Sequence, residues 1–394
     1  MQFAARNCTL GPTMNPADFK APKAGKLIPT IQGVAFVPAP LPPDLLDLAP
    51  LLPLVARATH ALGELSGIGR TLHNPYLLIR PFMRREAVAS SKIEGTVTTL
   101  TELFLFEVDQ EKGRATTDTR EVLNYVRALE HALSRLEKLP ISSRLIKEAH
   151  KILMRNVQQH RGATIIPGEY RTDQNWIGAR LIENARYVPP PPNEATEAMS
   201  DLEKYINALD ESLPTLIHLA LIHYQFEAIH PFPDRNGRVG RLLIPLILCE
   251  RKEISEPLLY LSTYFEKHYD EYIDNMLAVS QLGLWERWVE FFLVGVEEAC
   301  KDAIKRAQTL LDLQQTYRQK IQRARSSALL GRLIDLLFEH PAISVPYTAE
   351  KLGISYNAAK HNIEALIEHQ ILRPSPADTR PKYFVASEIV GVMS

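Results

Sequence analysis

The chain has 394 residues, 45% of them hydrophobic, and its 45 Lys and Arg residues nearly balance its 46 Asp and Glu residues. At roughly 100–200 residues per domain, this length predicts two or three domains with sizeable cores. The charge balance excludes a protein that is basic over its whole surface and coats nucleic acid, and it excludes an acidic solvating protein.

Cysteine usage and the lack of long apolar runs bear on the cell compartment. Cys8, Cys249 and Cys300 are odd in number and far apart, so they fit neither a disulfide framework nor a CxxC zinc site. The most apolar helical run, 242–249, is far shorter than the roughly 20 residues that span a bilayer. The first residues contain no apolar segment of the kind that secretory signals have. We therefore expect a cytoplasmic protein without a membrane segment.

Residues 1–110 are predicted to form a Pro-rich arm followed by helices. Prolines are concentrated in the first 55 residues and predict an extended arm, after which a helix begins near Pro43. Apolar residues recur at helical spacing in 51–65 and again in 82–95.

Residues 111–300 are predicted to form a helical core. Asp118-Thr-Arg-Glu121 has the spacing of a capping box and predicts that a helix starts with Asp118 as its N-cap. Glycines, prolines and short β-type pieces in 161–193 predict a loop with a small hairpin. The segment 216–230 is apolar nearly all round, which predicts a central, buried helix.

A connecting helix is expected at 301–325 and a separate domain at 326–394. Within that domain, a first helix is followed by two helices around a Gly-containing turn in 348–369 and by two short strands in 371–385. This order of elements is typical of a winged-helix domain.

One stretch carries most of the chemistry: His230-Pro-Phe-Pro-Asp-Arg-Asn-Gly-Arg-Val-Gly-Arg241. A histidine ends the buried helix, Asn236-Gly237 permits a turn with positive φ, and a new helix begins there. The backbone N–H groups of residues 235–239 then point into one concavity at a helix N-terminus, which is an anion-binding site.

The side chains of this stretch suit a nucleotide-transfer reaction. Arg238 and Arg241 are three residues apart and share one helical face beside the N–H groups, an arrangement that suits a di- or triphosphate. Asp234 is placed at the edge, where a carboxylate can hold Mg²⁺ that bridges phosphates. His230 faces the same hollow and can accept a proton from a hydroxyl.

This stretch resembles the signature H-P-F-x-[D/E]-G-N-G-R-x-x-R of the Fic-domain protein adenylyltransferases. Every fixed position matches except Arg235, where the family has Gly. Weaker similarities extend the resemblance over about residues 30–300. Gly168-Glu-Tyr-Arg171 resembles the element before the family's flap, and Tyr187-Val-Pro-Pro190 resembles the flap hairpin that clamps the target segment by strand addition. Parts of 261–272 resemble the helix that lines the adenine side.

A second stretch, Ser90-Ser-Lys-Ile-Glu94-Gly95, matches the family's inhibitory-helix motif [S/T]-x-x-x-E-[G/N]. Gly95 is typical of the residue that follows a helix, so Glu94 is expected in the last turn, where a carboxylate opposes the helix dipole. Such a local violation is expected where a specific partner compensates for it, and Arg241 is the natural partner.

The resemblance implies a mainly α protein with a Fic-type helical core and a small β-hairpin flap. The order of elements in 326–394 adds a C-terminal winged helix-turn-helix domain. It implies transfer of AMP from ATP to a Ser, Thr or Tyr hydroxyl of a target protein and of the enzyme itself, with Mg²⁺ as cofactor and pyrophosphate as product. ATP and an unidentified target protein are the implied partners, and a homodimer is compatible with the family.

The resemblance also assigns roles to single residues. His230 is the general base, Asp234 is the metal ligand, and Arg241 holds the γ-phosphate. Glu94, with Ser90 and Gly95, forms the inhibitory motif that competes for Arg241. The remaining ATP-binding and docking residues are implied by position: Arg235, Asn236, Gly237, Arg238, Val239 and Gly240 around the phosphates, Tyr272 on the adenine side, and Tyr187 and Val188 in the flap.

Three other functions stay open at this point. The same scaffold could transfer another phosphate-containing group, such as UMP, phosphocholine or a phosphate, because pocket shape decides the substrate. It could remove AMP, with Glu94 positioning a water. It could also be a DNA-binding regulator with a vestigial nucleotide site, although the intact His230, Asp234 and Arg241 argue against this.

The charge of the C-terminal region favours protein docking over DNA binding. Residues 326–394 carry six Lys or Arg and seven Asp or Glu. Phosphate contacts dominate the affinity of proteins for DNA, and they need a surplus of cationic side chains.

Overall fold

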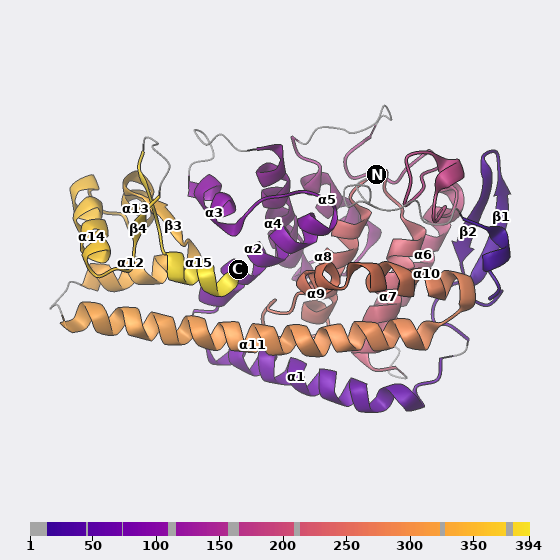
Figure 1. The fold of residues 1–394 in the computed structure, drawn as a ribbon, viewed down its shortest axis with the longest axis horizontal. Helices are drawn as coiled ribbons and strands as arrows, with labels where there is room; N and C mark the ends of the chain where they lie inside the picture. Colours follow the sequence, from indigo (N-terminus) through magenta and orange to yellow (C-terminus); the bar gives the residue numbers. More distant parts are fainter. Residues whose placement is uncertain are drawn as a thin grey trace.

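The computed structural model describes residues 14–44, 46–72, 74–108, 116–156, 165–208, 213–323, 328–375 and 381–394. Most of these residues are helical, so the expected mainly α architecture is confirmed (Figure 1). The helices are α1 (Leu52–Thr71), α2 (Tyr76–Ile93), α3 (Leu100–Val108), α4 (Thr117–Leu136), α5 (Ser143–Leu153), α6 (Pro192–Asn207), α7 (Thr215–Ile229), α8 (Asn236–Glu250), α9 (Ser262–Lys267), α10 (Tyr269–Leu282), α11 (Trp285–Arg323), α12 (Ala328–Glu339), α13 (Val345–Leu352), α14 (Tyr356–Glu368) and α15 (Ser387–Met393).

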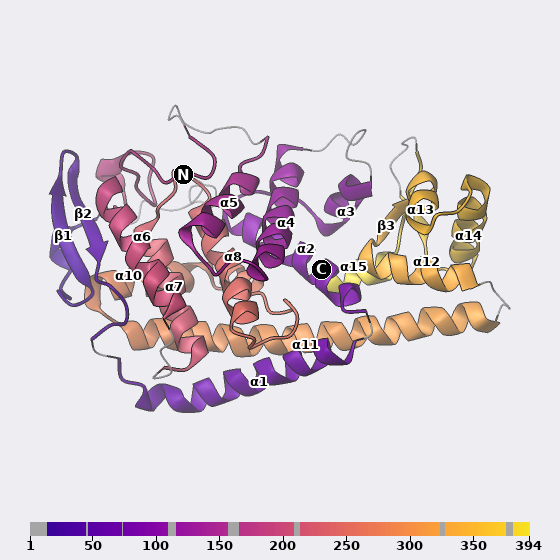
Figure 2. The same ribbon diagram turned by 180° about the vertical axis from the view of Figure 1, so that it is seen from behind.

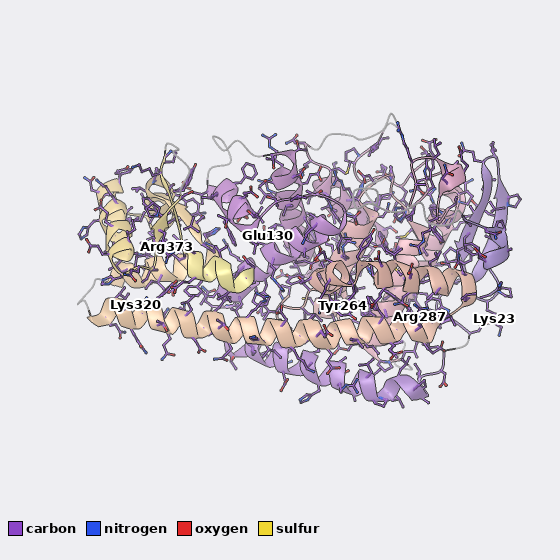
Figure 3. The ribbon with its side chains drawn as sticks, viewed as in Figure 1. Lys23, Glu130, Tyr264, Arg287, Lys320 and Arg373 are labelled. Atoms are coloured by element: carbon purple, nitrogen blue, oxygen red, sulfur yellow. The ribbon has the colours of Figure 1, made fainter. Side chains whose placement is uncertain are left out.

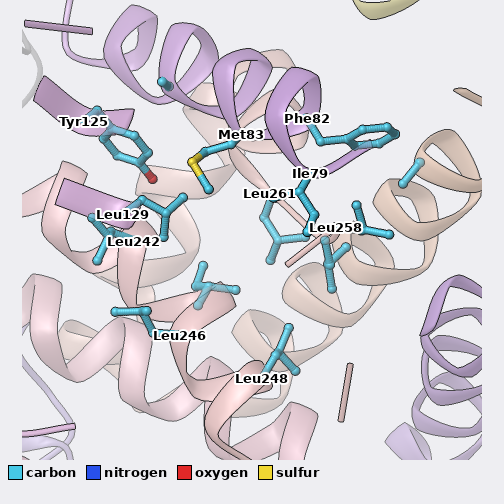
Figure 4. Close-up of a cluster of buried hydrophobic side chains, with 14 of the residues drawn as sticks. Ile79, Phe82, Met83, Tyr125, Leu129, Leu242, Leu246, Leu248, Leu258 and Leu261 are labelled. Atoms are coloured by element: carbon cyan, nitrogen blue, oxygen red, sulfur yellow. The ribbon is translucent and has the colours of Figure 1, made fainter. Parts of the chain in front are cut away.

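Helices α7 and α8 form the centre of the molecule. As its apolar sequence predicts, α7 is buried on nearly every side, and it packs against α6, α8 and α11. Helix α8 also contacts α2, α4 and α5. Figure 4 shows Met83 of α2, Leu129 of α4 and Leu242 of α8 in one buried cluster. Truncating such a leucine to alanine typically costs about 2–5 kcal/mol, so this packing fixes the position of the α7–α8 connection.

A two-stranded hairpin precedes the helices, where only an extended arm was expected. Strands β1 (Gly25–Thr30) and β2 (Gly33–Pro38) pair antiparallel, and Gly33 at the turn has φ 122°. The prolines within the strands hid their alternating pattern, since proline is unusual inside a sheet. The first helix accordingly begins at Leu52 and not near Pro43.

Helix α4 begins at Thr117 with Thr116 as its N-cap, so the expectation of Asp118 at that position is wrong. The Thr116 hydroxyl accepts the N–H of Thr119 at 3.2 Å, which satisfies one free donor of the first turn. Asp118 instead lies inside the first turn, where its carboxylate suits the helix dipole and accepts the N–H of Val97 at 2.9 Å.

The long helix α11 runs along almost the whole molecule (Figures 1 and 2). Its 39 residues correspond to about 60 Å at 1.5 Å per residue. Helix α1 packs along its first part, and α12 and α15 pack near its other end. The expected boundary at residue 300, between a core and a connecting helix at 301–325, does not coincide with any break in α11.

The C-terminal elements follow the order helix, strand, helix, helix, strand, strand, helix. Strands β3 (Ala342–Ser344), β4 (Arg373–Pro374) and β5 (Tyr383–Val385) form an antiparallel sheet in the order β3-β5-β4. Helix α12 packs against α2, and β3 packs against α3. Figure 3 shows Lys320 and Arg373 at this end of the molecule and Lys23 at the opposite end. The assignment of this unit as a winged helix stays a prediction.

Within the described residues, no helix combines the length and the apolar character that crossing a membrane requires.

Candidate active site

The loop between α7 and α8 carries His230 at its start. His230 ends α7 in a left-handed conformation, with φ 50°, which turns the chain sharply away from the helix axis. Arg171 stabilises this turn through two hydrogen bonds. Its Nε donates to the His230 carbonyl at 2.9 Å, and its backbone N–H donates to the Pro231 carbonyl at 2.9 Å. Asn175 adds a bond from Nδ2 to the Phe232 carbonyl at 3.1 Å.

The tautomer of His230 follows from its backbone contact. Nδ1 lies 3.3 Å from the carbonyl oxygen of Glu227, so Nδ1 carries the proton and Nε2 keeps a free lone pair. Burial of the ring, together with the nearby charge of Arg171, lowers the pKa of His230 to about 4. The ring is therefore neutral at pH 7 and is able to accept a proton.

His150 supports the same loop from α5. Its ring stacks on Phe232 with centroids 3.9 Å apart. Nδ1 accepts the N–H of Gly168 at 3.0 Å, so Nε2 carries the proton and donates to the Asp234 carbonyl at 3.2 Å. Burial lowers the pKa of His150 to about 4, which keeps this ring neutral and its donor in place.

At the end of the loop, directly before α8, the residue with positive φ is Arg235, with φ 63°, and not Asn236 or Gly237 as the sequence suggested. Both of those residues already belong to α8. A left-handed residue is easiest for glycine, which explains why the related motif has Gly at this position. The Asn236 side chain holds the loop closed: Oδ1 accepts the Phe232 N–H and Nδ2 donates to the Phe232 carbonyl, both at 2.8 Å.

Asp234 lies beside this turn with its side chain 24% exposed. Its Oδ1 accepts the N–H of Arg235 at 2.8 Å. Burial opposes the charged form, but the charge of Arg235 and this N–H hold the pKa of Asp234 below its usual value. Among the described residues, no three His, Cys, Asp or Glu side chains gather as a metal site would require.

The two arginines of α8 are buried, and Arg241 is paired with Glu94 as expected. Arg241 Nη2 donates to Glu94 Oε1 at 2.7 Å, while its Nε donates to the Ser90 hydroxyl at 2.9 Å. Burial alone raises the pKa of Glu94, but the charges of Arg241 and Arg238 more than offset this and lower it. Arg238 Nη2 donates to the Thr96 hydroxyl at 2.5 Å.

Helix α2 ends as the sequence predicts, and this ending aims Glu94 at α8. Gly95 has φ 82°, its N–H donates to the Lys92 carbonyl, and the N–H of Thr96 donates to the Ser91 carbonyl, each at 3.0 Å. This pair of bonds is a Schellman motif. It leaves Glu94 as the last residue before the turn, with its carboxylate on the first turn of α8.

Gly237 is required by that contact. A Cβ atom at Gly237 would lie 2.3 Å from Glu94 Oε1 and 2.9 Å from Arg241 Nη1, closer than real contacts allow. The N–H groups in the first turn of a helix have no acceptor within the helix, so the Glu94 carboxylate rests where an anion would be favoured.

Three other residues expected at the nucleotide are deeply buried. Val239 is 0% exposed, and Gly240 lies against α7, where a Cβ would meet Glu227 and Phe226. Tyr272 is 1% exposed, and its hydroxyl lies 2.7 Å from His223 Nε2. These residues shape the core behind the site and do not line an open surface in this conformation.

The expected flap is present as a single antiparallel bridge between Ile177 and Tyr187, without regular strands. The two residues expected in the flap, Tyr187 and Val188, are buried, and their backbone groups have partners within the chain. Tyr187 pairs with Ile177 on one side. The carbonyl of Val188 accepts the N–H of Phe36, and its N–H donates to the sulfur of Met14. Strand addition by a target at Tyr187 or Val188 therefore requires a partner to move.

Comparison with known proteins agrees with this geometry. Residues 52–134 match the model of the Fic/DOC family N-terminal region, and residues 140–248 match the model of the Fic/DOC family, which includes α5 to α8 and the His230 loop. The chain carries a Fic domain.

Known relatives of this Fic domain include a protein adenylyltransferase Fic of Drosophila willistoni, which is 31% identical over 160 residues. That match covers 40% of this chain and 30% of the relative, so the chain spans less than a third of the length of this curated relative. A Fic family protein from Desulfovibrio desulfuricans G20 has a similar fold, with a TM-score of 0.55 at 21% identity, over 88% of this chain and 98% of that one. A Fic domain containing signaling protein from Bacteroides thetaiotaomicron VPI-5482 gives a TM-score of 0.51 at 21% identity, over 65% of this chain and 97% of that one.

Sequence reasoning missed four side chains that build the Fic-domain site: Glu121, His150, Arg171 and Thr96. Arg171 was noted only as part of a weak motif, and Glu121 only as part of a capping signal that the structure does not use. Burial of a polar side chain is the signal they share, and it is visible only once the helices are packed.

Proposed function

We propose that this protein is an adenylyltransferase that transfers AMP from ATP to a Ser, Thr or Tyr hydroxyl of a target protein. One observation carries the proposal: a neutral His230 with a free Nε2 stands at a loop whose other end is a helix N-terminus flanked by two buried arginines. The name of the curated relatives supports AMP as the transferred group.

In the proposed reaction, Nε2 of His230 takes the proton of the target hydroxyl, and the hydroxyl oxygen bonds to the α-phosphorus of ATP. The bond between the α-phosphorus and its bridging oxygen to the β-phosphate breaks, and pyrophosphate leaves. The first-turn N–H groups of α8 and the guanidiniums of Arg238 and Arg241 would stabilise the phosphate charge.

The residues present fit Mg²⁺ only when phosphates complete its shell. Among the described residues of the loop, Asp234 offers a partly exposed carboxylate at the edge. Mg²⁺ is usually bound by one or two carboxylates together with substrate phosphates and waters. Asp234 would hold it, and the ion would neutralise charge on the phosphates. The depressed pKa of Asp234 keeps its carboxylate ionised for this role.

Glu94 supports an inhibited resting state in this proposal. Its carboxylate occupies the place on Arg241 and Gly237 that an anionic phosphate would use. ATP that binds around Glu94 would be displaced, and a displacement of about 1 Å can cost on the order of 10²-fold in rate.

We further propose that the C-terminal elements form a winged helix that docks a protein. The order of their helices and strands supports the assignment, and their near-neutral charge supports protein over DNA as the partner.

A labelling experiment tests the function. Incubation with ATP labelled at the α-phosphate should give covalently labelled protein, whereas label at the γ-phosphate should be released. His230→Ala should abolish labelling but leave ATP binding nearly intact, because affinity comes from the phosphate contacts. Covalent γ-label would indicate phosphate transfer, and near wild-type labelling by His230→Ala would refute the mechanism.

A further inference from the structure

Glu121 of α4 lies in the site, although nothing in its sequence context suggested a role there. The residue is 2% exposed. Its carboxylate accepts bonds from Arg235 of the loop, through Nη1 at 2.5 Å and Nη2 at 2.8 Å, and from Arg238 of α8, through Nη1 at 3.1 Å. The Thr96 hydroxyl donates to the same carboxylate at 3.1 Å.

Arg235 creates a problem that glycine at this position would not create. Its guanidinium is almost fully buried, and a buried charge without a partner costs several kcal/mol. Two carboxylates lie within reach: Glu121, which makes a two-pronged contact, and Asp234, whose Oδ2 is 3.5 Å from Arg235 Nε. That Nε has no hydrogen-bond partner among the described residues.

The charges of the site balance only with Glu121 included. Arg235, Arg238 and Arg241 face the carboxylates of Glu94, Glu121 and Asp234. Without the negative charge of Glu121, Asp234 would be the remaining acidic partner of Arg235. The guanidinium would then compete for the carboxylate that the proposed function assigns to the cation.

We propose that Glu121 is a positioning residue. By binding the Nη groups of Arg235, it limits the side-chain contact with Asp234 to a 3.5 Å ion pair in which Arg235 Nε makes no hydrogen bond. Asp234 is thereby left more available to a divalent cation, and Arg238 is fixed beside the phosphate site. This inference rests on the proposed function for the identity of the cation and the nucleotide. The pairing itself depends only on this chain's own residues.

The test uses Glu121→Gln, which keeps the size of the side chain and removes its charge. We expect a crystal structure of this variant to show Arg235 Nε hydrogen-bonded to Asp234 Oδ2, closer than the 3.5 Å of the ion pair in the wild-type protein. We also expect the Mg²⁺ concentration that half-saturates binding of a non-hydrolysable ATP analogue to rise on the order of tenfold, the scale of one charge-assisted hydrogen bond. Calorimetric titrations of Glu121→Gln in the Glu94→Gly background measure this half-saturating Mg²⁺ concentration.

Arg235→Gly should reverse the raised Mg²⁺ requirement of Glu121→Gln, because glycine suits φ 63° and removes the competing charge. In the Arg235→Gly background, Glu121→Gln should change the Mg²⁺ requirement by less than about twofold, whereas a merely structural role would leave the loss unrescued. Glu130→Gln is the matched control, since Glu130 is on the same helix and pairs with the buried Arg84. It should not move the Mg²⁺ requirement.

Three outcomes would overturn the proposal: an unchanged Mg²⁺ requirement in folded Glu121→Gln, a loss of binding that is equal at every Mg²⁺ concentration, or failure of Arg235→Gly to restore it. If Glu121→Gln does not fold, the Mg²⁺ requirement of Arg235→Gly is compared with that of the double variant Arg235→Gly with Glu121→Gln. The proposal expects these two requirements to be nearly equal. If no variant binds the nucleotide, the proposed function has failed, and the position of Arg235 in the crystal structure still tests Glu121.

Discussion

Single residues in this site are tuned by what surrounds them. Burial makes His230 a neutral group at pH 7, whereas arginines keep Asp234, Glu94 and Glu121 ionised despite their burial. A base, an ionised carboxylate at the loop edge and three paired guanidiniums therefore coexist in the loop and the helices that contact it. Their protonation states are the first properties that experiment can check.

The pH dependence of AMP transfer should show the lowered pKa of His230. An ordinary histidine with a pKa near 6.5 loses its base form below that pH. Since the pKa of His230 is lowered to about 4, its base form persists as pH falls, and kcat/KM of Glu94→Gly should hold between about pH 7 and pH 5. Initial rates across this range measure it. A tenfold fall by pH 5.5 that tracks a pKa near 6.5 would contradict the expected protonation state.

Gly237 should couple to Glu94 in a double-mutant cycle. Gly237→Ala places a methyl group on the Glu94 carboxylate, so it should destabilise the wild-type protein by about 1–3 kcal/mol. In the Glu94→Gly background, Gly237→Ala should lower the free energy of unfolding by about 1 kcal/mol less than it does in the wild type. The clash with Glu94 Oε1 is then gone, and only Arg241 remains close. Urea unfolding of the four variants gives both values. Additive costs would show that Glu94 does not rest on Gly237 in solution.

At the scale of elements, the end of α2 contacts the side of α8 through Ser90, Glu94 and Thr96. Ser90, Glu94 and Thr96 each bind an arginine of α8, so the last turn of α2 and the turn after it form one contact. The Schellman turn fixes where the chain leaves α2, and thereby which way Glu94 points. Release of Glu94 alone would still leave Ser90 and Thr96 holding α8.

Glu94→Gly should therefore activate and destabilise at the same time. AMP transfer, including self-modification, should rise because Arg241 becomes available to the γ-phosphate. The free energy of unfolding should fall by about 1–3 kcal/mol, because a buried guanidinium loses its charged partner but keeps Ser90. A time course of label incorporation and urea unfolding measure the two effects.

Arg241→Ala is the control, and it should abolish transfer with either residue at position 94. A rate in Glu94→Gly that is equal to or below wild type would remove the inhibitory role from Glu94.

The sequence predicted elements well where one signal dominated. The buried helix α7 and the end of α2 at Gly95 were predicted, since apolar runs and a C-terminal glycine are local signals. The Glu94–Arg241 pair spans 147 residues and was expected only because both residues belong to motifs that resemble those of one family. The start of α4 was misplaced because Thr116 and Asp118 are both good N-caps, and only packing decides between them. The partnership of Glu121 with Arg235 spans 114 residues, so no local pattern could reveal it.

At the scale of the whole molecule, the C-terminal elements are attached to the same helix that carries Glu94. Arg80 of α2 contacts Glu339 and His340, and Asn74 contacts Glu339 at 3.2 Å. Burial and the charge of Arg80 lower the pKa of His340 to about 3, so this contact keeps a neutral imidazole at neutral pH.

Duplex DNA should bind the full chain weakly. The C-terminal region has no surplus of cationic residues, and DNA affinity without phosphate contacts is low and sensitive to salt. Fluorescence anisotropy with a random duplex at physiological salt should give a Kd no tighter than micromolar. Nanomolar binding that is lost in Lys360→Ala with Arg373→Ala would instead favour a DNA-binding regulator.

The length of α11 has a mechanical consequence. Half of the helix measures about 30 Å, so a bend of about 10° at its middle would shift its far end by about 5 Å. A small tilt of α11 where it leaves the helices of the core would thus be magnified at its far end, next to the C-terminal elements. Conversely, a partner that binds the C-terminal elements and displaces them by a few ångströms would bend α11 by only a few degrees and would shift α2 and the core correspondingly little.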